Sequence, residues 1–142
     1  MIRHLLPLIL LVAASAPQAA PDDPRTPVPV SAETRQLVLQ EMRGFVEALA
    51  GITGALARGE VAAVADLAQP HGMQAMQAFP RQNMREMPEP FRALGRAVHQ
   101  DFDRLATDAR AGVTVGEARA TVSQALAKCS GCHVAYRLEV RE

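Results

Sequence analysis

Three residues near the C-terminal end of the chain have the types and spacing to attach a cofactor covalently. Residues 129–133 read Cys-Ser-Gly-Cys-His, which is the C-x-x-C-H pattern of c-type haem attachment. Positions three apart share one face of a helix, so Cys129 and Cys132 can both reach the two vinyl groups of one haem. His133 follows directly, and haem iron commonly takes a proximal histidine. The motif therefore predicts one covalent haem c whose iron is ligated by His133.

Other uses of this motif explain less of it. A redox dithiol also carries C-x-x-C, but usually near a βαβ pattern. A zinc site needs about four ligands, so His71 or His99 would have to join the three clustered residues. A disulfide between the two cysteines leaves His133 without a role. Haem attachment uses all three clustered residues and does not require His71 or His99.

The composition indicates one helical domain. The chain has 142 residues, of which 49% are apolar, with no Trp, one Tyr and four Phe. Ala and Leu supply much of the rest and favour helix over sheet. Fifteen basic residues balance fifteen acidic ones, and this balance argues against a nucleic acid partner. Two cysteines are too few for a disulfide framework.

The first twenty residues have the pattern of a secretory signal peptide. Arg3 is basic, residues 5–14 are largely apolar, and small residues follow up to Ala20. The apolar run is too short to span a bilayer as a helix, although an uncleaved anchor is the alternative. Export fits haem attachment, which is completed outside the cytoplasm, so we expect a periplasmic protein. Residues 21–30 are rich in proline and predict an extended linker.

Residues 31–142 are expected to form a single helical domain. Helices are predicted over about 32–58, from 60 to just before Pro70, 89–111 and from 114 towards 136, with a further turn or two over 71–79. Ser31 is a candidate N-cap, and Thr114 with Glu117 forms a capping-box pair. The prolines of residues 80–90 indicate a loop.

These helices predict an all-α fold. No segment alternates convincingly with a period of two residues, and no hairpin signal is present. Four amphipathic helices with short connections make an antiparallel four-helix bundle most simply. An open helical array is the alternative.

The motif and its position resemble a known family. Cys129-x-x-Cys132-His133-x-x-Tyr136-Arg137, on the last of four helices, resembles the class II c-type cytochromes, the cytochrome c′ group. The resemblance covers about residues 32–140. It implies a left-handed four-helix bundle with the covalent haem near one end, and a homodimer through the first two helices. It also implies that Tyr136 packs against the porphyrin and that Arg137 pairs with a propionate.

The same resemblance implies that the residue on the far side of the iron comes from the first helix. Met42 resembles the methionine of the low-spin, six-coordinate members, which carry electrons. Leu39, four residues after Arg35, resembles the apolar residue that covers an open iron site able to bind NO or CO. We predict Met42 as the ligand, and hence an electron carrier between exported redox partner proteins rather than an enzyme. A gas-binding protein with Leu39 over the iron is the alternative.

Several other residues could touch a haem. Methionine at helical spacing is more often core filler than ligand, and this applies to Met73, Met76, Met84 and Met87. His99 lies within the third helix and is expected to be hydrogen-bonded or solvent-facing. His71 is expected at the surface. No triad, phosphate loop or paired carboxylates stand out.

Overall fold

The computed structural model describes residues 23–141, so the predicted signal peptide lies outside the described residues. The described part is mostly helical. Its helices are α1 (Ala32–Ala57), α2 (Val61–Ala68), the short 3-10 helix η1 (Gln69–His71), α3 (Met73–Ala78), α4 (Arg81–Glu86), α5 (Glu89–Arg110) and α6 (Val115–Ala135). Two strands, β1 (Thr26–Val30) and β2 (Tyr136–Val140), flank them.

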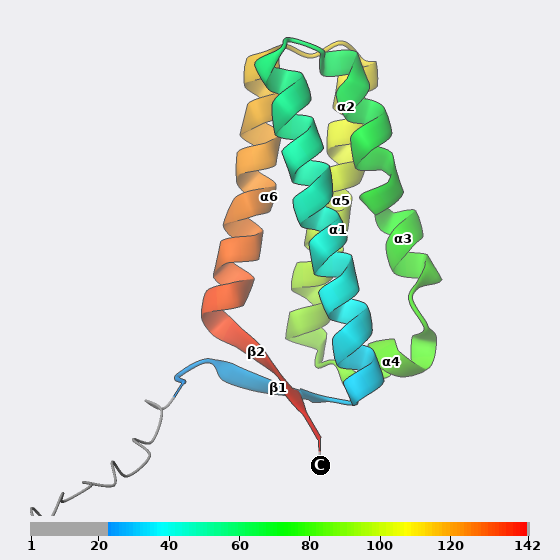
Figure 1. Cartoon of the computed structure of the whole chain (residues 1–142), viewed down its shortest axis with the longest axis vertical. Helices are drawn as coiled ribbons and strands as arrows, with labels where there is room; N and C mark the ends of the chain where they lie inside the picture. Colours follow the sequence, from blue (N-terminus) through cyan, green and yellow to red (C-terminus); the bar gives the residue numbers. More distant parts are fainter. Residues whose placement is uncertain (1–22, 142) are drawn as a thin grey trace, which may run out of the picture.

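The long helices lie side by side along the long axis of the molecule (Figure 1). The helices α1 and α5 run away from the strands, whereas α2–α3 and α6 run back towards them. The helix α2 packs on α1 and α5, and α6 packs on α5 and α1. Within residues 23–141, no helix combines the length and apolar character needed to cross a bilayer.

The predicted helix ends are close to those in the structure. The side chain of Ser31 accepts a hydrogen bond from the backbone amide of Thr34 and starts α1. Thr114 and Glu117 form both bonds of the capping box that starts α6. Gly59 and Gly112 have φ angles of 77° and 76°, and they make the turns after α1 and α5 at the end away from the strands.

The prediction of a loop over residues 80–90 is wrong for its first part. Arg81–Glu86 form α4 between Pro80 and Pro88. Proline is tolerated at the start of a helix, where its missing N–H has no partner to lose. The prolines therefore bound a short helix.

The prediction of an all-α fold omits a small parallel sheet. β1 pairs with β2 from Thr26↔Tyr136 to Val30↔Val140. β1 falls within the predicted linker, which is extended but belongs to the folded domain from Thr26 onward. Val28 and Val30 are completely buried, which anchors the strand. The two strands therefore join the start of the described chain to the residues directly after the C-x-x-C-H motif.

The apolar core has two parts. One lies between the helices and contains Ile52, Leu56, Val64, Phe102 and Leu105, among others. The second lies at the end with the strands. Its buried members are Val28, Val30, Val38, Met87 and Phe91, and Met42, Cys132 and Tyr136 are among the partly buried residues that pack on them. The cysteine motif thus reaches both parts of the core, since Cys129 packs on the first and Cys132 on the second.

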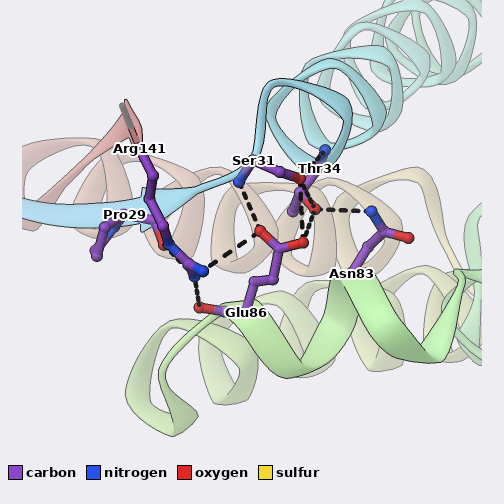
Figure 2. Close-up of polar contacts among 6 residues, drawn as sticks. All are labelled: Pro29, Ser31, Thr34, Asn83, Glu86 and Arg141. Carbon is purple, nitrogen blue, oxygen red and sulfur yellow. Dashed lines mark hydrogen bonds and ion pairs between the residues drawn. The ribbon is translucent and has the colours of Figure 1, made fainter.

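A polar network fixes the start of α1 against α4 (Figure 2). The carboxylate of Glu86 accepts hydrogen bonds from the amide of Ser31 at 2.6 Å and from the hydroxyl of Thr34 at 2.9 Å. Asn83 donates to the Thr34 hydroxyl oxygen at 2.8 Å. Arg141, after β2, reaches Glu86 at 3.8 Å and the carbonyl of Pro29 at 2.8 Å. The network ties α1, α4 and both strands together.

Thr34→Val is expected to destabilise the fold by about 1–3 kcal/mol, because it removes the acceptor that the buried Asn83 amide needs. The valine keeps the shape of the side chain, so packing changes little. Thr53→Val is the matched control, since the exposed Thr53 hydroxyl bonds only carbonyls of its own helix. Chemical denaturation of both variants measures the difference. Equal stabilities would show that the network does not stabilise the fold.

Candidate functional site

The C-x-x-C-H motif occupies the last turns of α6, as the sequence predicts. Cys129 and Cys132 are free thiols and half-buried. His133 is exposed. Burial raises the pKa of both thiols above its ordinary value. The C-terminal end of a helix also disfavours a nearby thiolate, so this position is unlike that of a reactive dithiol.

Both cysteines and His133 line an apolar cavity that opens to solvent. The cavity has a volume of about 100 Å³. This volume is smaller than the roughly 300–1,000 Å³ that is usual for cofactor pockets, so a larger group would extend through the open mouth. α1 contributes Val38, Met42 and Phe45 to its walls, α5 contributes Phe91, Leu94 and Val98, and the segment between them contributes Met76, Phe79, Met84 and Met87. The motif therefore faces an open apolar cavity that could receive part of a large apolar group.

A second cavity of about 200 Å³ adjoins the first. The two have four lining residues in common, namely Met42, Phe91, Cys132 and His133. The other residues that line the second cavity are Arg25, Arg35, Leu39, Tyr136, Arg137 and Leu138. One cavity is thus apolar and the other carries three guanidinium groups. A flat molecule with an apolar body and an anionic edge would match the pair.

Met42 and Leu39 both line the second cavity, but only Met42 also lines the first. Met42 lines both cavities together with Cys132 and His133. Leu39 lines only the second cavity, beside Arg35. Both residues are half-buried on α1. The α1 side chain that meets the motif in both cavities is therefore Met42.

Tyr136 and Arg137 also lie at the site, at the start of β2. Tyr136 meets Phe91 edge to face, with ring centroids 5.7 Å apart. Arg137 pairs with Glu139 at 2.8 Å, but its Nε is buried and has no hydrogen-bond partner. Arg92, on the wall of the apolar cavity, also has a buried Nε without a partner. Each of these N–H groups could donate to an acceptor brought by a bound group.

His99 is buried and hydrogen-bonded, which confirms one of its two predicted roles. Its Nδ1 lies 2.8 Å from the carbonyl oxygen of His71, and its Nε2 lies 3.3 Å from Glu41. Burial alone would lower the pKa of His99, but these two acceptors raise it above its ordinary value. Its ring nitrogens are therefore already engaged. His71 is half-buried, so the expectation of a surface position is wrong.

Among the described residues, no three His, Cys, Asp or Glu side chains converge on a point that could hold a metal ion. The zinc alternative therefore finds no support in the site. Haem iron needs fewer ligands from the protein than zinc does, because the porphyrin supplies four ligands and the chain only the remaining ones.

The sequence did not identify every residue at the site. Arg25 lies in the predicted linker, and only the strand pairing brings it to the second cavity. Phe91 lines both cavities, and no signal in the sequence indicates this. Met76, Met84 and Met87 line the apolar cavity, whereas Met73 does not.

Comparison of the chain with protein-family models, curated proteins and solved structures found no match. The site must therefore be interpreted from its own residues.

Proposed function

We propose that this chain is an exported c-type cytochrome that carries electrons. Cys129 and Cys132 would hold one haem through thioether bonds, and His133 and Met42 would ligate its iron. The observation that carries the proposal is that both thiols and His133 line an apolar cavity whose α1 wall contains Met42. We further infer that the long helices form an antiparallel four-helix bundle with the haem at the end near the strands. Their side-by-side packing supports this.

The residues present fit a haem. The apolar lining of the first cavity suits the body of a porphyrin, and the second cavity offers cations to its two carboxylates. The orphaned Nε atoms of Arg92 and Arg137 are donors that such a group could satisfy. When bound, the haem would supply an iron that gains and loses one electron.

The chain's own residues would hold the haem in place and limit the rearrangement that accompanies electron transfer. Two thioether bonds would fix the haem, so His133 would need only to ligate the iron. A thioether from Met42 as a second ligand would favour the reduced iron. Val38, Phe45 and Phe91 would exclude water from the apolar cavity, which reduces solvent rearrangement on transfer.

A gas-binding protein is the second candidate. Leu39 and Arg35 line the second cavity beside His133, so a haem seated further towards that cavity would meet an apolar side chain instead of a ligand. The iron would then be five-coordinate and open to NO or CO.

Absorption spectra of the purified protein distinguish the two functions. The electron-carrier proposal predicts low-spin spectra in both oxidation states, and slow, incomplete binding of CO to the reduced protein. A high-spin spectrum with rapid CO binding would instead support the gas-binding protein.

A further inference from the structure

Three arginines from three separate segments surround the second cavity. Arg25 directly precedes β1, Arg35 lies on α1 and Arg137 on β2, and all three line the cavity with Cys132 and His133. Arginine clusters of this kind bind carboxylates well, because the planar guanidinium can donate two parallel hydrogen bonds.

Arg25 is also tied to the motif itself. Its Nη1 lies 3.4 Å from the carbonyl oxygen of His133. Its Nε and Nη2 bind the carboxylate of Asp23 at 3.0 and 2.6 Å. The parallel pairing of β1 with β2 places Arg25 there, since Thr26 is opposite Tyr136.

Asp23 is a carboxylate that contacts two of these three arginines. It lies 4.0 Å from Arg137 as well as against Arg25. The hydrogen bond from the Arg25 side chain lowers the pKa of Asp23 to about 2, so this carboxylate stays ionised at neutral pH. The backbone amide of Arg35 donates to the carbonyl of Ser31, but its guanidinium makes no hydrogen bond or ion pair within residues 23–141. The cluster therefore has three cations, and Asp23 and Glu139 as counter-charges.

We propose that Arg25 is a positioning residue for the carboxylates of the haem, and that Asp23 opposes its effect on the iron. This inference rests on the proposed function. The segment before α1 would thus set the reduction potential from outside the helices. A cation near the haem favours Fe(II), which carries one positive charge fewer than Fe(III), and an anion disfavours it.

Two variants of the haem-loaded protein test this role, because they should shift the reduction potential in opposite directions. Arg25→Gln should lower the reduction potential, and Asp23→Asn should raise it. Each should change the Fe(III)/Fe(II) equilibrium by about two- to tenfold, where tenfold corresponds to about 59 mV for one electron. A loss of local structure alone would not produce shifts of opposite sign.

The matched controls are Arg58→Gln and Glu60→Gln. Arg58 and Glu60 form an exposed pair at the opposite end of the molecule, 2.7 Å apart and two residues apart in sequence, like Asp23 and Arg25. The two control variants should therefore have the same reduction potential as the unmodified protein. If the haem is attached but Arg25→Gln and Asp23→Asn leave the potential unchanged or move it in the same direction, the role of Arg25 is overturned and the proposed function stands. If the exported protein carries no covalent haem, both are overturned.

Discussion

Replacing both cysteines, Cys129→Ala and Cys132→Ala, is expected to leave an exported chain with no covalently bound haem. Both thiols line the apolar cavity, and the proposal assigns each of them one thioether bond. Haem staining after denaturing electrophoresis should therefore fall from one haem per chain to none. Each single variant should keep haem through one remaining bond, with a shifted absorption spectrum, because one vinyl group stays unsaturated.

Ser130→Ala is the matched control for these variants. Ser130 is exposed and occupies one of the two positions between the cysteines. Its replacement should leave staining and spectra unchanged. Full staining of the double cysteine variant would contradict covalent attachment at this motif.

Met42→Ala is expected to convert the iron from six-coordinate to five-coordinate. The thioether of Met42 is the proposed ligand opposite His133, and alanine cannot replace it. The oxidised spectrum should change from low-spin to high-spin, and CO should bind the reduced variant rapidly. Loss of a ligand that favours Fe(II) should also lower the potential by about 59 mV or more, at least tenfold in the Fe(III)/Fe(II) equilibrium.

Leu39→Ala is the control on the same helix. Leu39 is half-buried like Met42, but it lines only the second cavity. Its truncation should keep the low-spin spectrum. A Met42→Ala variant with an unchanged low-spin spectrum would contradict the assignment of Met42 as a ligand of the iron. Faster CO binding in Leu39→Ala alone would favour the gas-binding alternative.

The helices could be predicted because their signals are local. Ser31 and the pair Thr114 and Glu117 cap their helices through side chains that lie within one turn. Gly59 and Gly112 end their segments through a backbone conformation that other residues rarely adopt. Each of these signals acts without help from distant parts of the chain.

The sheet could not be predicted, because its signal is not local. β1 contains Pro27 and Pro29, which have no N–H to donate and suggest a linker. Thr26, Val28 and Val30 can still donate, and the partner strand lies more than one hundred residues further on. Burial of Val28 and Val30 against the end of the helices favours the pairing, and this depends on the tertiary fold.

The site was predictable at the motif and only in part around it. The spacing of Cys129, Cys132 and His133 is a property of one helix, so the sequence suffices. The choice between Met42 and Leu39 depends on how α1 meets α6, and three residues of spacing leave both near the same face. Arg25 reaches the site only through the sheet, and this explains why it was missed.

Trypsin digestion of the denatured exported protein shows whether haem is covalently attached to the C-x-x-C-H motif. Lys128 and Arg137 flank the motif, so cleavage after each releases the peptide from Cys129 to Arg137. We expect this peptide to carry the mass of one haem and to have no free thiol. The same peptide with two free thiols, or with a disulfide between Cys129 and Cys132, would contradict it.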